Sequence, residues 1–450
     1  MIRNEARDWW RRESVAGRSG QSGASVDQRL GTPGSGPAFW SMVTFTGILL
    51  LAPQAYFPAL APLRLAFWAA VIAVVAYVAD RLARGVPIIV MSRELRVAAC
   101  LAGWALLTVP LSLWPGGSLQ RLQDGYLKSL VIFYLLSNLV DSVPRLRQTC
   151  WALALLSVPL AATGITQYVQ GIFLNPGGAV ERIEGYSAPL TSNPNDLALM
   201  LNLILPLTIA LFFFERGGGR RLLLAGTIAL SVIAVVVTFS RGGFVTLASI
   251  TCMYLWKLRK RPERHWVYAC LVLTVICIPL LPGGYLHRIE TVTDTSKDVT
   301  GSSEARWIDS VAALRVVLKH PVVGAGIGGN ILALNTERGD NWHAVHNAYL
   351  EYAVDLGLPG LALFLLLLFG CIRRVGELLR RTGRAGETAR LAYLAEGVQA
   401  SLYAFAVAAL FHPVAYHFYF YYLAGLAVGV SRVGGMSAEP EPGPSARARA

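Results

Sequence analysis

Long apolar runs, separated by short polar segments, place the strongest constraint on how this chain can fold. A membrane-spanning helix needs about 20 mostly apolar residues. About 12 such runs occur, near 39–57, 62–79, 97–115, 125–140, 147–168, 196–214, 222–239, 242–256, 265–283, 347–371, 391–411 and 415–431. The runs are continuous rather than alternating, which argues against a membrane β-barrel. The sequence therefore predicts an all-α integral membrane protein with about 12 transmembrane helices.

The composition supports a membrane protein and argues against a nucleic-acid-binding one. Of the 450 residues, 54% are hydrophobic and only 15% are charged, whereas soluble domains carry about 25% charged residues. The net charge of +13 lies mostly in short loops, without the stripe of basic and aromatic residues that nucleic-acid binding needs. The six cysteines fall in or beside apolar runs, so neither a disulfide framework nor a zinc site is predicted.

The distribution of Lys and Arg predicts the orientation in the membrane. Alternate loops are basic, around residues 81–96, 145–147, 216–221, 257–264 and 373–390, and such loops remain in the cytoplasm. Both terminal tails, 1–38 and 434–450, then also face the cytoplasm, and their compositions predict disorder. Arg11-Arg12 is not followed by an apolar segment, so no export signal is predicted. We expect a multi-pass membrane protein.

The longest polar segment falls on the opposite, non-cytoplasmic side. Transmembrane helices 1–9 would occupy residues 39–283, the polar loop 284–345, and helices 10–12 residues 346–433. Apolar residues from Glu304 to His320 recur at helical spacing, which predicts an amphipathic helix on the outer leaflet: Trp307, Ile308, Val311, Leu314, Val317 and Leu318. Residues 324–329 match GxGxxG but follow a helix, so we expect a flexible loop rather than a nucleotide site.

Two arginines at the outer ends of helices are candidates for anion binding. The apolar stretch from Leu222 to Trp256 contains one charged residue, Arg241, and is too long for a single crossing, so the chain must turn there. Arg241 either reaches towards the membrane surface or binds a phosphate. Arg182 either pairs with a neighbouring Glu or serves the same anion. Asn195 or Ser192 is expected to cap the following helix.

Histidines and aromatic residues near the predicted outer face leave several alternatives open. His343 and His346 could ligate a metal, but no third ligand is evident. His346 is either a structural cap or interface residue or a general base, since histidine titrates near neutrality. An aromatic cluster after Pro413 predicts an interfacial belt, with sugar stacking as the alternative: Tyr416, Phe418, Tyr419, Phe420, Tyr421 and Tyr422.

Four signatures in this order resemble those of the O-antigen ligase/polymerase superfamily. They are Arg182 ahead of Asn193-Pro194-Asn195, then Ser240-Arg241-Gly242-Gly243, then Arg306-Trp307 with His320-Pro321, and finally His346-Asn347 followed by Gly357-Leu358-Pro359-Gly360. The resemblance covers roughly residues 180–365. It implies a metal-independent glycosyltransferase of the bacterial inner membrane, without a cofactor, that uses an undecaprenyl-diphosphate-linked glycan at the periplasmic face.

The resemblance also implies roles for particular residues. His346 would be the general base, and Arg241 and Arg182 would stabilise the departing diphosphate. Arg306, Asn347, His343 and Asn195 would contact the substrates. The acceptor would be a lipid A core in a ligase or another glycan in an O-antigen or exopolysaccharide polymerase, and a further branch of the superfamily glycosylates protein.

Two functions outside glycosyl transfer are also considered. A flippase for lipid-linked glycans would also have about a dozen helices, but we would expect its cationic residues inside a central cavity. Here they lie at the outer ends of the predicted helices, which favours the enzyme. A non-catalytic assembly factor is the other alternative.

Overall fold

The computed structural model describes residues 36–174, 176–177, 180–259, 261–277, 279, 284–285, 289–290, 301–382 and 386–436. Most of the two tails predicted at 1–38 and 434–450, most of 278–283 at the end of the predicted ninth span, and most of 284–300 in the predicted loop therefore lie outside the described residues. The remaining ends of those tails are helical, because residues 36–38 begin one helix and residues 434–436 end another.

A helix lies at each of the twelve predicted apolar runs. These helices are α2 (Gly36–Leu51), α4 (Leu65–Ala83), α5 (Arg93–Thr108), α7 (Leu127–Leu139), α8 (Val143–Gln170), α9 (Pro194–Phe214), α10 (Gly218–Val237), α11 (Arg241–Leu258), α12 (Arg264–Cys277), α16 (Ala348–Arg381), α17 (Gly386–Ala408) and α18 (Phe418–Met436). Seven helical segments of the described chain are long and apolar enough to cross a membrane. The fold is therefore all-α and of membrane type, and the count of about 12 spans stays a prediction.

Shorter helical elements connect the long ones. They are α3 (Pro53–Tyr56), η1 (Pro58–Leu63), η2 (Val109–Leu111), α6 (Pro115–Arg121), η3 (Leu122–Tyr126), α14 (Ser302–Lys319) and α15 (Asn330–Arg338). A single antiparallel bridge, between Phe173 and Ile183, is the β-type pairing found in the described part of the chain.

Glycines let the central helices approach closely. A Cβ on Gly397 of α17 would lie 2.5 Å from the Cβ of Ala210 in α9, and one on Gly425 of α18 would lie 2.6 Å from the Cβ of Leu136 in α7. Small residues at such crossings allow close backbone packing, which drives helix association in a membrane.

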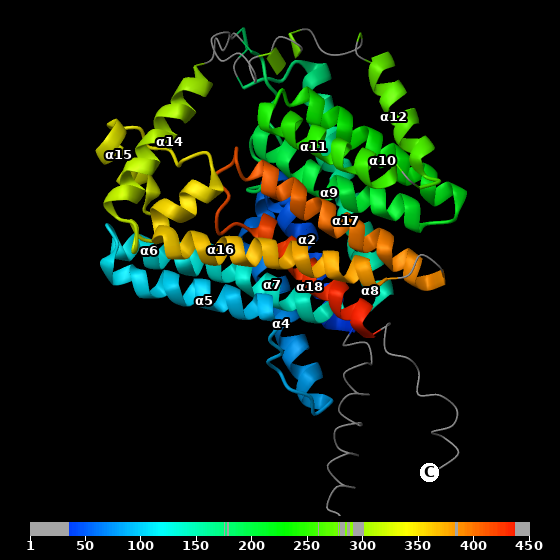
Figure 1. The fold of residues 1–450 in the computed structure, drawn as a ribbon, viewed down its shortest axis with the longest axis horizontal. Coiled ribbons are helices and arrows are strands. Elements are labelled where there is room, and N and C mark those ends of the chain that lie inside the picture. The colour runs from blue at the N-terminus through cyan, green and yellow to red at the C-terminus, as the bar shows by residue number, and fades with distance from the viewer. Residues whose placement is uncertain are drawn as a thin grey trace, which may run out of the picture.

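The two ends of the helix bundle differ in character. α14 and α15 pack against each other and against α16, and lie together at one end, here called the α14 end (Figure 1). The other end, here called the basic end, carries ion pairs that join neighbouring helices and loops: Arg147–Glu215, Arg261–Glu396 and Arg374–Glu94. The predicted basic loops that contribute residues to these ion pairs thus lie at one end of the bundle.

α14 confirms the amphipathic helix predicted near Glu304–His320. Its buried face consists of Asp309, Ala312, Ala313, Val316 and Val317, whereas the large apolar side chains Trp307 and Leu318 are 71% and 80% exposed. An exposed apolar face suits a helix on a membrane surface, and contact with the outer leaflet stays a prediction.

The predicted interfacial belt of aromatic residues after Pro413 is wrong. Tyr416, Tyr421 and Phe420 are each at most 2% exposed, so they form part of the core rather than an interfacial belt. The Tyr352 and Tyr421 hydroxyls lie 3.0 Å apart within hydrogen-bonding distance. Because these rings pack on α16, they are also inaccessible for stacking on an acceptor sugar.

The glycine-rich segment 324–329 was expected to be flexible, and the structure contradicts this. The amides of Ala325 and Gly326 donate to the carbonyls of Val354 and Asp355 at 2.7 and 2.8 Å. The Asp355 carboxylate accepts from the amides of Gly328 and Asn330 at 2.8 and 2.7 Å. Gly324, Gly326 and Gly328 have φ between +73° and +91°, which glycine adopts without steric cost. The glycines thus form a turn fixed on α16.

Candidate functional site

A pocket at the α14 end brings together six of the seven predicted site residues. Its volume is about 300 Å³, and it is lined by Arg182, Asn195, Phe239, Arg241, Ser302, Ala305, Arg306, Asp309, His343 and His346. The lining comes from segments far apart in the sequence: the α8–α9 loop, the starts of α9 and α11, α14, and the segment before α16. We call it the arginine pocket.

Arg182 is held by the loop-to-helix junctions around it. Its Nη2 donates to Asn195 Oδ1 at 2.8 Å, and its Nε donates to the Thr238 carbonyl at 3.1 Å. Asn195 Oδ1 also accepts from Ser240 Oγ at 2.9 Å. These bonds tie the start of α9 to the turn between α10 and α11, and they fix the direction of the guanidinium group.

The cap of α9 differs from the expected one. Asn193, rather than Asn195 or Ser192, caps the helix, because its Oδ1 accepts from the amides of Asn195 and Asp196, both at 3.0 Å. Capping therefore leaves the Asn195 side chain available for the contacts with Arg182 and Ser240.

The predicted turn at Ser240-Arg241-Gly242-Gly243 is present between α10 and α11. Phe239 has φ +51°, an uncommon conformation for a bulky residue that often accompanies functional sites. A Cβ on Gly243 would lie 2.7 Å from the Cβ of Ala198 in α9, so the second glycine allows the start of α11 to approach α9.

Arg241 is the first residue of α11 and reaches α14. Its Nη1 donates to Ser303 Oγ at 2.6 Å, and its Nη2 donates to Ser302 Oγ. The planar guanidinium group spans both hydroxyls, which aligns it with the wall of the arginine pocket.

His346 lies in the segment just before α16, half-buried in the pocket. Its Nδ1 is buried and has no hydrogen-bond partner among the described residues. Burial, then the nearby charge of Arg306 and then His343, lower the pKa of His346 from 6.5 to about 4, while Asp309 acts in the opposite direction. The imidazole of the free protein is therefore neutral at pH 7 and able to accept a proton.

A chain of contacts supports the neighbouring His343. Its Nε2 lies 2.9 Å from Asp309 Oδ2, and Arg338 donates to the other oxygen of the same carboxylate. The rings of His343 and His346 are 5.7 Å apart between centroids. Asp309 is only 2% exposed, so this buried carboxylate fixes the wall on which both histidines lie.

Asn347 does not line the arginine pocket. Its Oδ1 accepts from the amides of Tyr349 and Leu350 at 2.9 and 3.1 Å and thereby caps α16. Its position in the sequence signature is explained by this cap, which places His346 one residue before the cap and two before the helix begins at Ala348.

Asp309 adds a third possible metal ligand that the sequence did not reveal. Ligand atoms of Asp309, His343 and His346 all lie within 4.8 Å of one another, so the spacing fits a cation. The charges fit less well, since Asp309 already accepts from Arg338 and His343 and three arginines line the same pocket. This electrostatic environment favours an anion over a divalent cation.

Helix termini add to the preference for an anion. α9, α11 and α16 begin at Pro194, Arg241 and Ala348, and residues at or beside each start line the pocket. The N-terminus of a helix carries a partial positive charge, which favours negative groups.

Sequence reasoning missed Ser302, Ala305 and Asp309 as pocket residues. Together with Arg306 they recur at positions i, i+3, i+4 and i+7 of α14, which is the spacing of one helical face. Reading the polar stripe of this helix, rather than its apolar one, would have identified them.

These observations define a class of protein: a helical membrane protein with an arginine-lined pocket at one end of its helix bundle. The family model described as O-antigen ligase matches residues 226–365, which confirms the resemblance to the O-antigen ligase/polymerase superfamily. The matched residues include Arg241, Arg306 and His346, whereas Arg182 and Asn195 precede them. A comparison with curated proteins returned no match.

Proposed function

We propose that this protein transfers a glycan from undecaprenyl diphosphate to an acceptor hydroxyl at the periplasmic face of a bacterial inner membrane. The observation that supports this most strongly is the arginine pocket, in which Arg182, Arg241 and Arg306 line the same cavity as His346. The reaction requires positive charge that stabilises the departing diphosphate and a base that accepts the hydroxyl proton. The arginines and His346 of the pocket are suited to these two tasks.

In the proposed reaction the acceptor oxygen attacks the anomeric carbon of the lipid-linked sugar. The hydroxyl proton passes to His346, and the bond between the anomeric carbon and the diphosphate oxygen breaks. The bonding pair remains on the departing undecaprenyl diphosphate, whose charge the three guanidinium groups stabilise. Donors that are already oriented when charge develops contribute most to such stabilisation.

Binding of the donor would also raise the pKa of His346. Burial, and next to it the positive charge of Arg306, lower the pKa of His346 in the free protein. A bound diphosphate offsets that charge and raises the pKa, so that His346 becomes a stronger base when the donor is present. His343, fixed by Asp309, and Asn195, which orients Arg182, act as positioning residues in this proposal.

The topology follows from the same proposal. The arginine pocket faces the periplasm and the basic end faces the cytoplasm, as the positive-inside rule requires. Arg261, Arg374 and Arg147 form ion pairs at the basic end. Adding a cysteine at exposed His320 or exposed Arg380 and labelling intact cells with an impermeant maleimide tests this, since only the first variant should react.

Purified protein in liposomes, supplied with lipid-linked glycan and acceptor, tests the transfer. His346→Ala should lower the rate by about 10²–10⁴-fold, the usual contribution of a general base, while His320→Ala, an exposed residue outside the pocket, should leave it unchanged. Equal rates for wild type and His346→Ala would contradict the proposal. Movement of donor across the bilayer without transfer would instead indicate a flippase.

The acceptor separates the ligase, polymerase and protein-glycosylating forms of this proposal. Deleting the gene should leave full-length polymer on the lipid carrier if the protein is a ligase, and single repeats if it is a polymerase. Loss of glycan from protein, with lipid-linked glycan otherwise normal in length, would indicate a protein glycosyltransferase.

A further inference from the structure

A second and larger pocket lies at the basic end, between α11, α16 and α17. Its volume is about 740 Å³. Arg241 at the start of α11 lines the arginine pocket, whereas Lys257 near the end of α11 lines this one. At 1.5 Å per residue of helix, about 24 Å separates these two positions, so the second pocket is distinct from the proposed site of transfer. We call it the α11–α17 groove.

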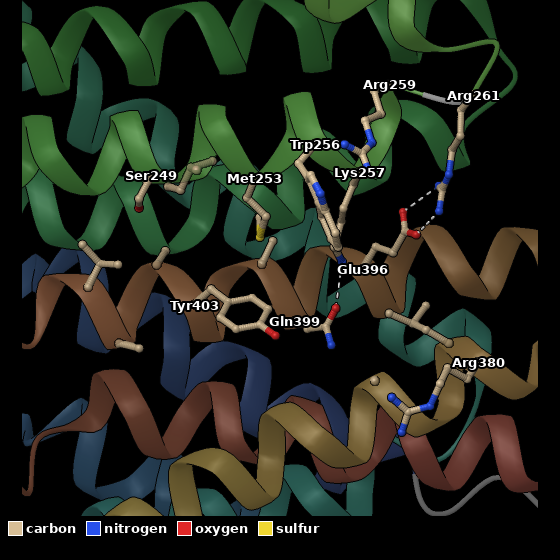
Figure 2. A pocket seen from close by; sticks show the side chains of 17 residues that line it. Ser249, Met253, Trp256, Lys257, Arg259, Arg261, Arg380, Glu396, Gln399 and Tyr403 are labelled. Carbon is tan, nitrogen blue, oxygen red and sulfur yellow. Dashed lines mark hydrogen bonds and ion pairs between the residues drawn. The ribbon is translucent and has the colours of Figure 1, made fainter.

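One helix forms the floor of the groove and two form its walls. α17 packs against both α11 and α16. Figure 2 shows Glu396, Gln399 and Tyr403 on α17, between Met253 and Lys257 on one side and Arg380 on the other. Towards the middle of the bundle the lining is apolar and includes Ile250, Ala404 and Val407. The groove therefore changes along its length from a polar end to an apolar one.

The polar end carries an excess of positive charge. Lys257, Arg259, Arg261 and Arg380 line it together with one acid, Glu396, which makes four positive charges against one negative charge, a difference of +3. Glu396 is occupied by Arg261, whose Nη1 lies 2.9 Å from its Oε2.

The other three basic side chains form no ion pair with a carboxylate of the described residues, although Glu396 attracts Lys257 and Glu377 attracts Arg380 electrostatically. Lys257 Nζ donates to the neutral amide oxygen of Gln399 at 2.7 Å. Arg259 lies over the Trp256 ring at 5.5 Å from its centroid, and Trp256 is 64% exposed. A tryptophan beside basic residues at the end of a transmembrane helix is typical of the headgroup region of a bilayer.

We propose that the α11–α17 groove binds an anionic phospholipid from the leaflet at the basic end. The phosphate would contact Lys257, Arg259 and Arg380, and an acyl chain would follow the apolar lining past Ile250 and Val407. A basic pocket between helices that continues into apolar surface suits a lipid headgroup and its chain, whereas a soluble anion has no use for the apolar part.

Native mass spectrometry of the purified full-length protein tests this binding. Phosphatidylglycerol and phosphatidylcholine, added separately at equal concentration, differ in net charge while sharing their chains. The wild type should retain phosphatidylglycerol in preference, and Arg259→Gln/Arg380→Gln should weaken that retention at least tenfold, given the contribution of each basic residue near a membrane surface.

A matched double variant controls for general surface charge. Arg93 and Arg96 are exposed residues of α5 outside the groove, and they lie at the basic end because their neighbour Glu94 pairs with Arg374. Arg93→Gln/Arg96→Gln removes the same charge and should retain phosphatidylglycerol as the wild type does. Equal weakening in both double variants would overturn the proposal, since it would show unspecific attraction.

Two further measurements separate a lipid from a free anion and from a folding defect. Glycerol 3-phosphate, which carries a phosphate group but no acyl chains, should fail to compete at the concentration of the lipid, and effective competition would overturn the proposal. Val407→Trp fills the apolar part without altering charge and should also weaken retention. If the Gln variant fails to fold, equal retention of both lipids by the wild type still overturns the proposal.

Discussion

Arg182 donates a hydrogen bond to Asn195 at 2.8 Å across an interval of 13 residues. Asn195 lies in the first turn of α9, so the helix start determines where a guanidinium group from the preceding loop points. Two residues that the sequence offered as separate candidates thus form one unit, in which one carries the charge and the other sets its direction.

Replacing Asn195 should therefore impair Arg182 indirectly. Asn195→Ala removes the acceptor and should lower kcat/KM for the lipid-linked donor by about tenfold, the usual effect of losing a hydrogen bond to a charged group. Arg182→Ala should cost more, at least about 100-fold, because it also removes the charge.

Steady-state kinetics with varied donor measure both effects. Asn193→Ala serves as the control, because it weakens the cap of α9 and should lower stability by about 1 kcal/mol. An Asn195→Ala enzyme with wild-type kcat/KM would show that this contact has no part in positioning Arg182.

The geometry of Arg241 predicts that lysine cannot replace it. Its two terminal nitrogens donate to Ser302 and Ser303, and the single ammonium group of lysine cannot span both hydroxyls while facing a diphosphate. Arg241→Lys should lower kcat by about 10- to 100-fold, with normal amounts of folded protein.

The comparison variant for Arg241 is Ser303→Ala, which keeps the guanidinium group and loses one of its two serine contacts. It should lower kcat by less than Arg241→Lys does. If Arg241→Lys transfers glycan at the wild-type rate, positive charge alone is sufficient at this position and the bidentate contact is dispensable.

The sequence predicted the helices well because apolar runs of helical length are a local property. It failed where the answer depends on partners distant in the chain. Tyr416 and Tyr421 have the composition of an interfacial belt, yet they are buried because α16 packs over them. The polar face of α14 was visible, but the pairing of Asp309 with His343, 34 residues away, was not.

Six of the residues that line the arginine pocket were predictable from the sequence, but their arrangement was not. Arg182, Arg241, Arg306 and His346 came from ordered signatures, and the structure places them around one pocket. Asn347 belongs to the same signature as His346, but it caps α16 and does not line the pocket. A signature alone cannot distinguish a residue that lines a pocket from one that shapes the backbone beside it.

The low pKa of His346 predicts an unusual pH dependence. Its value of about 4 in the free protein means that the imidazole stays neutral as pH falls from 8 to about 5. If His346 is the base, kcat/KM should stay level over this range and decline only as pH approaches 4, because that ratio reports the free enzyme. Bound diphosphate raises the pKa, so kcat should decline at a higher pH than kcat/KM.

Rates measured from pH 4 to 8 with saturating and limiting donor separate these two profiles. His343→Gln removes the neighbouring imidazole, so a decline that persists in this variant does not come from His343. A decline of kcat/KM centred near pH 6.5 in the wild type would show that His346 is not shielded from protonation as its burial and Arg306 require.

Charge in the arginine pocket predicts that transfer does not depend on a divalent cation. Asp309, His343 and His346 could supply three ligands, but Arg338 and the three arginines oppose a cation there. Treatment with a chelator should change the transfer rate by less than about twofold. Loss of activity on chelation, restored by one particular metal ion, would assign these three residues to a metal site instead.

Gly357 lies where α16 bends, and its replacement should be disruptive. It has φ +68° and ψ −174°, a region that is essentially restricted to glycine and costs other residues about 1–3 kcal/mol. A Cβ there would lie 2.1 Å from the Val322 carbonyl oxygen. Gly357→Ala should therefore lower the stability by at least about 3 kcal/mol, or shift the segment that carries His346 and reduce transfer.

Gly370 provides the matched control for this bend, because it lies further along the same helix and a Cβ there would meet nothing within 4 Å. Gly370→Ala should leave transfer unchanged and raise stability by up to about 1 kcal/mol, the difference in helix propensity. Thermal unfolding in detergent compares the two variants directly. If Gly357→Ala matched Gly370→Ala in both stability and transfer, the bend in α16 would have no role in placing His346, and the Gly-Leu-Pro-Gly signature would need another explanation.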